Sequence, residues 1–174
     1  MLYYDLVDSG CNIDPKLQFN LGFKKIFKNK NDIQIADVDS LKSDFNQYFI
    51  YGSNTSRLIS GLRNGSAGLM INDYNLDKKL IQFTLGNKSP IIISINKLMH
   101  DTGFSRQRDL LFIRRLIKYI KARKIEFSIV TFADTDQYMC SYIQLLEISK
   151  LFFDNPNEAI KHITNLKKLI ENER

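Results

Sequence analysis

Residues 90–96 read PIIISIN and residues 125–133 read IEFSIVTFA, and these two apolar runs decide the fold. Continuous runs rich in β-branched residues are typical of strands that are covered on both faces. Between them, residues 105–123 repeat apolar side chains at helical spacing. Two neighbouring strands joined by a helix of this length are expected to be parallel, because parallel pairing needs a long crossover connection. The segment 90–133 therefore predicts one β-α-β unit of an α/β protein.

The same alternation of strand and helix patterns extends to both ends of the chain. Further strands are expected at residues 2–7, 23–27, 33–36, 48–51 and 68–72. Helices are expected from Asp14-Pro15 to Gly22, over 53–65, over 75–87 with Gly86 just past the end, over 140–153, and over 157–172 with a possible break at Thr164-Asn165. Six or seven mostly parallel strands predict either a small, incomplete (β/α) barrel or an open doubly wound sheet, because full eight-fold barrels begin at about 200 residues.

Length and composition favour a single globular domain over residues 1–174. Hydrophobic residues make up 44% of the chain and charged residues 25%, which is typical of a packed domain and not of a disordered chain. No apolar run approaches the roughly 18 residues of a membrane span, and the polar start MLYYDLVDSG does not read as a signal peptide. We therefore expect a cytoplasmic protein that does not enter a membrane. In that reducing compartment, Cys11 and Cys140 are expected to be free thiols.

The positive charge of the chain is concentrated in one segment. The formal net charge is +6. Residues 97–124 hold nine basic residues and only two acidic ones, so this segment carries +7 and the rest of the chain −1. Basic charge confined to one element indicates a surface that faces a polyanion more strongly than the same charge spread evenly.

The helix at 105–123 is amphipathic. At 100° per residue, one sector holds four cations: Arg114, Arg115, Lys118 and Lys121. The opposite sector holds the apolar residues Phe112, Ile113, Leu116, Tyr119 and Ile120. An ordinary solvated helix of an α/β protein would give the same stripe, but such helices usually mix signs to gain i,i+4 ion pairs. One alternative is a contact with nucleic acid phosphates, to which Arg106 and Arg108 add donors at the start of the helix. The other is a contact with a membrane surface or an acidic protein.

Motifs for catalysis or metal binding are weak. His100 and His162 are the only histidines, and neither belongs to an HxH, HxxxH or HExxH pattern. Asp134 and Asp136 follow a predicted strand, where a carboxylate could act in a site or cap the next helix. No glycine-rich phosphate loop and no GxSxG motif occurs. We therefore expect no catalytic residue, no metal ligand and no cofactor bound by the protein.

The order of segments resembles a known family over residues 48–171, with a weaker match at 2–7. The segments that carry the resemblance are YFIYGSNTSRLISGL, GLMIND, IIISINKLM, RDLLFIRRLIKYIKARK, EFSIVTFA, LEISKLFF, NEAIKHIT and NLKKLI, with LYYDL at the start. In this order and spacing they resemble the thirty-kilodalton protein subunit family of archaeal and eukaryotic ribonuclease P. This chain is shorter than typical members, chiefly between residues 28 and 47.

The resemblance implies a TIM-like (β/α) barrel and a role as a protein subunit of a ribozyme. Removal of the 5′ leader from precursor tRNA would then be catalysed by the RNA with its bound Mg²⁺, without intrinsic catalysis by the protein. Its expected partners are the ribonuclease P RNA and a second small protein subunit. By charge and geometry alone, the expected RNA contacts are Arg106, Arg108, Arg114, Arg115, Lys118 and Lys121.

Two other functions remain open from the sequence. The barrel of this family is shared with metal-dependent phosphoesterases of the polymerase-and-histidinol-phosphatase type. Those enzymes use several histidines around two or three metal ions, whereas this chain has two histidines. The third candidate is a structural domain whose basic helix meets an acidic protein.

Overall fold

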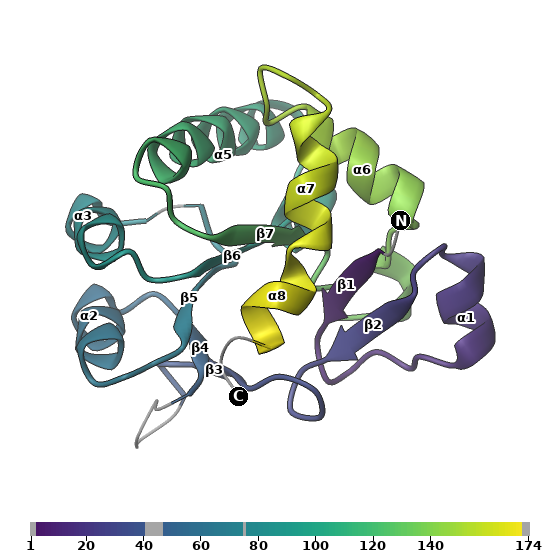
Figure 1. The fold of residues 1–174 in the computed structure, drawn as a ribbon, viewed down its shortest axis with the longest axis horizontal. Helices are drawn as coiled ribbons and strands as arrows, with labels where there is room; N and C mark the ends of the chain where they lie inside the picture. The colour runs from purple at the N-terminus through teal and green to yellow at the C-terminus, as the bar shows by residue number, and fades with distance from the viewer. Residues whose placement is uncertain (1–2, 41–46, 75, 172–174) are drawn as a thin grey trace.

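The computed structural model describes residues 3–40, 47–74 and 76–171, which form an α/β structure with two parallel sheets (Figure 1). The larger sheet has five strands in the order β3 (Ile35–Asp37), β4 (Phe49–Tyr51), β5 (Gly68–Ile71), β6 (Ile91–Ser94) and β7 (Phe127–Val130). The smaller sheet pairs β1 (Tyr4–Val7) with β2 (Lys25–Lys28). All pairings between these strands are parallel, which confirms the expected α/β class. Residues 2, 75 and 172 of the expected elements, and 41–46 of the segment 28–47, lie outside the described residues.

Helices follow β1, β4, β5, β6 and β7 along the chain and surround the strands (Figure 1). In chain order they are α1 (Pro15–Asn20), α2 (Thr55–Arg63), α3 (Lys78–Asn87), α4 (Asn96–His100), α5 (Gly103–Ala122), the short 3₁₀-helix η1 (Asp136–Tyr138), α6 (Tyr142–Lys150), α7 (Glu158–Thr164) and α8 (Leu166–Glu171). Figure 1 shows α2, α3 and α5 following one another around the outside of the five-stranded sheet, with α1 beside β2.

Local sequence signals account for most helix ends. The carboxylate of Asp14 accepts a hydrogen bond from the Leu17 N–H at 2.6 Å, directly before Pro15 at the first helical position. The expected break near the C-terminus is confirmed at Asn165, whose side-chain amide donates to the carbonyl of Phe127 at 3.1 Å. The expected end at Gly86 is wrong. Helix α3 continues through Gly86 to Asn87, because Lys88 supplies the left-handed residue (φ 54°) that ends the helix.

Hydrogen bonds join the two sheets at both of their edges. Beyond β7, the Phe132 N–H donates to the carbonyl of Leu6 at 2.7 Å, and the Asp8 N–H donates to the carbonyl of Ala133 at 2.9 Å. Between β2 and β3, Asn29 forms a parallel bridge with Ile33, and its side-chain oxygen accepts the Ile35 N–H at 3.0 Å. Hydrogen bonds therefore link the two sheets in two places, from the residues after β7 to β1 and from the end of β2 to β3.

One buried apolar cluster contains a side chain from every strand. These residues are Leu6, Phe27, Ile35, Phe49, Met70, Ile92 and Val130. Leu166, Leu169 and Ile170 of α8 belong to the same cluster. The neighbouring residues along the strands, such as Ile91 and Ile93, belong to a second cluster that includes the buried faces of the outer helices. Both faces of the strands are therefore covered, as the continuous apolar runs at 90–96 and 125–133 predict.

A buried carboxyl group links β1 to the residues after β7. Asp5 is fully buried, and its two carboxylate oxygens accept hydrogen bonds from the N–H and the hydroxyl of Thr131 at 2.8 and 2.5 Å. Burial raises the pKa of Asp5 from 3.8 to about 6, although the hydrogen bonds from Thr131 act in the opposite direction. The native state therefore holds a proton between about pH 4 and pH 6 that the unfolded chain has already released.

We predict that Asp5→Asn removes this proton uptake and keeps the link, because the amide can still accept from the Thr131 N–H. In the parent, the raised pKa of Asp5 contributes at most about 3 kcal/mol to the unfolding free energy. This contribution is fully present below the unfolded pKa of the group and is lost as the pH rises through 6. Relative to Asp5→Asn, the parent should lose unfolding free energy from pH 4 to pH 6.5, as measured by urea titration at each pH.

The comparison with the variant is needed because His162 has the opposite effect. Its pKa is lowered to about 4 by burial, so its contribution to stability falls as the solution becomes more acid than about pH 6.5. Glu147→Gln, which alters an exposed carboxylate on α6, controls for the loss of one charge. Parallel stability curves for the parent and Asp5→Asn across this range would show that the carboxyl group of Asp5 titrates normally.

Candidate nucleic-acid interface

Helix α5 carries the candidate interface, and its packing sets which side chains face outward. The aliphatic residues Ile113, Leu116, Ile117 and Ile120 are buried against the fold. Each such burial contributes roughly 1.5–3 kcal/mol, so together they fix the rotation of the helix about its axis. All four cations of the expected sector, Arg114, Arg115, Lys118 and Lys121, are exposed on the other side. The predicted amphipathic arrangement of these residues is confirmed.

Tyr119 is the exception on the apolar side. It was expected to pack inward, but 62% of its surface is exposed. Successive residues of a helix lie about 100° apart around its axis. Tyr119 is therefore rotated by about 100° from Ile120, which marks the centre of the buried stripe together with Ile113. A tyrosine tolerates this position because its hydroxyl group is polar.

Two acidic residues beyond α6 neutralise part of the basic face. One oxygen of Asp154 lies 2.7 Å from the Arg114 guanidinium and the other lies 3.2 Å from the Lys118 amine. Hydrogen bonds from Arg114 and then Lys118 hold the pKa of Asp154 below its ordinary value. Lys121 forms an ion pair with Glu158, at the start of α7. The sequence does not predict these contacts, because the carboxylates belong to a segment about 40 residues further along the chain.

Other cations at this surface form no ion pair with any residue that the structure describes. Within residues 3–40, 47–74 and 76–171, the side chain of Arg115 has no hydrogen bond or ion pair, and the same holds for Arg123 and Lys124. Exposed ion pairs such as Arg114–Asp154 contribute only about 0–1 kcal/mol, so a competing anion can replace the carboxylate at little cost. The surface of α5 therefore stays positive, though less so than the sequence alone suggests.

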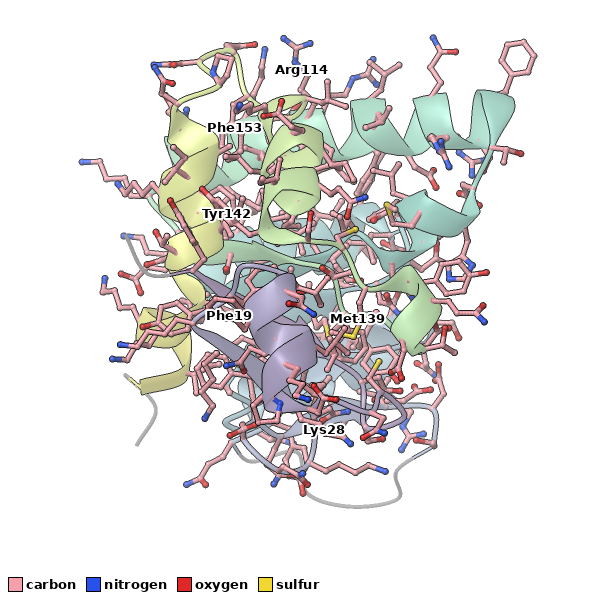
Figure 2. The ribbon with its side chains drawn as sticks, turned by 90° about the vertical axis from the view of Figure 1, so that its right-hand side faces the viewer. Phe19, Lys28, Arg114, Met139, Tyr142 and Phe153 are labelled. Atoms are coloured by element: carbon pink, nitrogen blue, oxygen red, sulfur yellow. The ribbon has the colours of Figure 1, made fainter. Side chains whose placement is uncertain are left out.

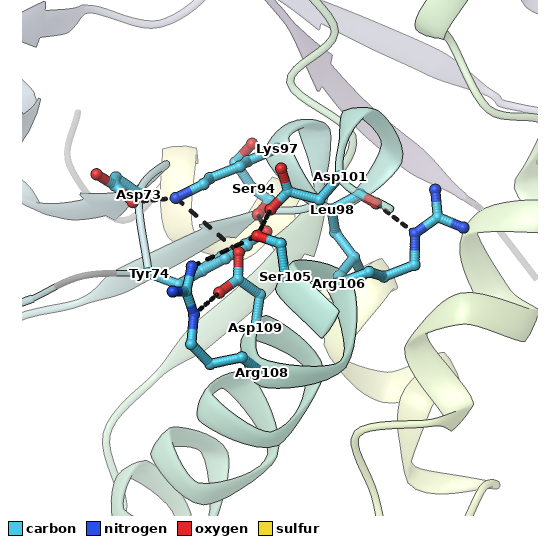
Figure 3. A network of polar contacts seen from close by, with 10 residues as sticks. All are labelled: Asp73, Tyr74, Ser94, Lys97, Leu98, Asp101, Ser105, Arg106, Arg108 and Asp109. Carbon is cyan, nitrogen blue, oxygen red and sulfur yellow. Dashed lines mark hydrogen bonds and ion pairs between the residues drawn. The ribbon is translucent and has the colours of Figure 1, made fainter. Parts of the chain in front are cut away.

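Arg106 and Arg108, also expected to contact RNA, form hydrogen bonds within the protein at the start of α5, although 71% of the Arg108 side chain stays exposed (Figure 3). The guanidinium of Arg106 donates to the carbonyl oxygens of Leu98 and Met99, at 3.2 and 3.3 Å. These carbonyls lie near the end of α4, where helical partners are lacking. Arg108 donates to the carboxylate of Asp109 at 3.1 Å. The structure therefore separates these two residues from the group formed by Arg114, Arg115, Lys118 and Lys121.

The buried carboxyl group of Asp109 explains why Arg108 and Lys97 lie close to it. Its side chain is 2% exposed, and burial raises its pKa, as does the nearby carboxyl group of Asp101. Lys97 lies 3.9 Å from it and pairs more closely with Asp73, at 2.5 Å (Figure 3). Lys97 and Arg108 thus serve as counter-charges to buried or neighbouring acids, which offset part of the positive charge of residues 97–124.

A second basic region, which the sequence did not indicate, adjoins the C-terminal end of α5. A hollow of about 570 Å³ is lined by four lysines, Lys121, Lys124, Lys161 and Lys168, together with Glu126 and Glu158. The ring of His162 stands at this hollow and stacks on Phe127, with ring centres 3.9 Å apart. Lys161 and Lys168 belong to α7 and α8, and the sequence alone does not tell that these helices meet the end of α5. The positive surface therefore extends beyond one helix.

The two cysteines and the two aspartates after β7 have structural surroundings. Cys11 and Cys140 are free and buried, as predicted. Asp136 caps no helix; its carboxylate accepts the N–H of Asn12 at 2.8 Å, and Asp134 lies 3.8 Å from His100. In the described part of the chain, no group of three or more His, Cys, Asp or Glu residues is placed to hold a metal ion. Nor does that part contain a helix long and apolar enough to cross a membrane.

No protein-family model fits the chain, and no curated protein sequence matches it.

We predict that Asp154→Asn exposes additional positive charge without harming the fold. Because this carboxylate is 65% exposed, its loss should change the unfolding free energy by less than about 1 kcal/mol. The variant should elute from a heparin column at a higher salt concentration than the parent, since Arg114 and Lys118 lose their counter-charge. Glu147→Gln, which removes the same charge from an exposed pair with Lys150 on α6, is the matched control. Equal shifts for the two variants would mean that the α5 face has no special affinity for polyanions.

Proposed function

We propose that this protein is a non-catalytic, RNA-binding subunit of an archaeal-type ribonuclease P, a short and divergent member of the thirty-kilodalton subunit family. The observation that carries the proposal is the exposed cationic face of α5, held outward by a buried aliphatic stripe. The order of segments along the chain, which resembles that family, supports it. In this role the protein supports the RNA-catalysed removal of 5′ leaders from precursor tRNA, together with a second small protein subunit.

We also propose that the strands form a small TIM-like barrel. Two observations support closure. Hydrogen bonds run from the residues after β7 to β1 and from the end of β2 toward β3. One apolar cluster takes a side chain from each strand, as the interior of a small barrel does. Helix α8 would then close one end of that interior with Leu166, Leu169 and Ile170.

The proposed work of the α5 face is to neutralise phosphates. RNA is a dense polyanion, and each phosphate that a lysine or arginine neutralises releases counterions, which favours binding at low salt. Arg115 is available without rearrangement, whereas Arg114, Lys118 and Lys121 would exchange carboxylates for phosphates. Backbone contacts of this kind position a folded RNA without reading its sequence. Mg²⁺ and the chemical step would belong to the RNA.

Charge reversal of Arg114, Arg115 and Lys118 to Glu is predicted to weaken binding to ribonuclease P RNA transcribed in vitro. Each lost phosphate contact should lower the slope of log K against log salt by about 0.7–0.9, so the slope should flatten by about two to three in total. Filter binding over a series of salt concentrations measures both quantities. Reversal of three scattered exposed lysines, Lys16, Lys24 and Lys78, makes the same change of charge elsewhere and should have a much smaller effect.

Two results would count against the assignment. If the α5 variant and the scattered variant lose affinity equally, general charge and not the α5 face governs binding. If the parent protein binds ribonuclease P RNA no better than an unrelated structured RNA of equal length, the ribonuclease P assignment fails even where RNA binding itself remains.

A further inference from the structure

One row of residues on the exposed side of α5 holds aromatic and aliphatic side chains as well as cations. We call this row, which runs from Phe104 to Tyr119, the ridge of α5. Phe104 is 91% exposed, Tyr119 62% and Leu111 49%. Exposed large apolar side chains in a group indicate a binding surface more often than single ones do. Neither ring is needed to hold the helix in place, because the buried stripe on the opposite side does that. These residues are therefore free to contact another molecule.

The spacing of these residues places them in one line with two arginines. Along α5 the order is Phe104, Arg108, Leu111, Arg115 and Tyr119, at intervals of three or four residues. Such intervals put side chains on one face of a helix, and the line extends about 22 Å. Its first half borders a shallow hollow of about 400 Å³, lined by Phe104, Gln107, Arg108, Leu111, Phe112 and Arg115. Apolar and cationic groups thus alternate along the line.

This alternation distinguishes between two kinds of partner. A site for a protein helix usually has an apolar centre with charged residues at the rim. Here Arg115 stands in the middle of the line, between Leu111 and Tyr119, so an apolar protein surface would have to bury an unpaired guanidinium. Single-stranded nucleic acid fits the order better, because its bases stack on aromatic rings while its phosphates meet the intervening cations.

We propose that the ridge of α5 binds unpaired nucleotides of an RNA, with bases stacked on Phe104 and Tyr119 and a phosphate at Arg115. This inference rests on the proposed RNA-binding function and makes it more specific. The exposed cations Arg114, Lys118 and Lys121 bind the RNA backbone, and the ridge selects places where bases are not paired. Phe104 and Tyr119 lie near the two ends of the helix and would contact different nucleotides.

The test compares two RNA probes with the same stem: a hairpin that has an unpaired uridine-rich loop, and a fully paired duplex. The double variant Phe104→Ala, Tyr119→Ala should bind the hairpin at least about ten-fold more weakly than the parent, since removal of one stacking ring usually costs roughly five- to one-hundred-fold. Its affinity for the duplex should stay within about two-fold. Tyr119→Phe, which keeps the ring, should retain the parent's affinity for the hairpin.

Phe19 provides the matched control. It is 82% exposed on α1, away from α5 (Figure 2), so Phe19→Ala removes an equally exposed ring without touching the ridge. This variant should bind both probes as the parent does. Because all three rings are largely exposed, the variants should fold, and their circular dichroism spectra should match that of the parent.

The outcomes separate this inference from the proposed function. If the double variant binds both probes like the parent, while charge reversal at Arg114, Arg115 and Lys118 weakens both, the stacking proposal is overturned and the RNA-binding function stands. If the double variant loses equal affinity for both probes, the rings do not select unpaired bases, and the proposal is again overturned. If the parent binds neither probe at low salt, the stacking proposal is overturned, and the filter-binding experiment with ribonuclease P RNA decides the proposed function separately.

Discussion

The burial of one aliphatic stripe of α5 is the constraint on which the candidate interface depends. Ile113, Leu116, Ile117 and Ile120 contact the core, and no polar contact on the outer face could compete with that burial. The rotation of the helix is thereby fixed, and with it the side of the helix on which the cations from Arg114 to Lys121 lie. A single helix thus has two roles at once: it connects β6 to β7 in the parallel fold, and it presents a cationic surface to the solvent. The structural and the functional interpretations of this segment are compatible.

The charge of the segment divides between the interior and the surface. Lys97 and Arg108 lie next to the buried carboxyl group of Asp109, and Arg106 donates to backbone carbonyls at the end of α4. Asp154 and Glu158 offset part of the outer face. What remains for a partner is Arg115 with Arg123 and Lys124, cations that can be released from exposed ion pairs, and a lysine-lined hollow beside α7. Net charge by segment is therefore a guide to where a polyanion binds, but it overstates how many residues are free to bind it.

Local patterns predicted the elements well, and long-range contacts escaped prediction. The β-branched runs at 90–96 and 125–133, the cap at Asp14 and the break at Asn165 are all decided within a few residues, so the sequence shows them directly. The prediction that Tyr119 lies on the buried side is wrong, because the hydrophobicity of one residue does not show how wide the buried stripe is. The hydrogen bonds of Asp5 with Thr131 and the ion pair of Asp154 with Arg114 join distant segments, and such pairs can only be identified once the fold is known. The same holds for the lysines of α7 and α8 that extend the basic surface.

Cross-linking to RNA in living cells tests the central claim most directly. Ultraviolet irradiation, purification of the protein under denaturing conditions, and sequencing of the attached RNA identify the partner, while mass spectrometry of the cross-linked peptides locates the contact. The account predicts that ribonuclease P RNA is enriched and that the cross-linked peptides come from residues 103–124, where Phe104 and Tyr119 supply exposed rings. Recovery of no RNA, or of cross-links confined to peptides outside α5 and its basic neighbours on α7 and α8, would contradict it.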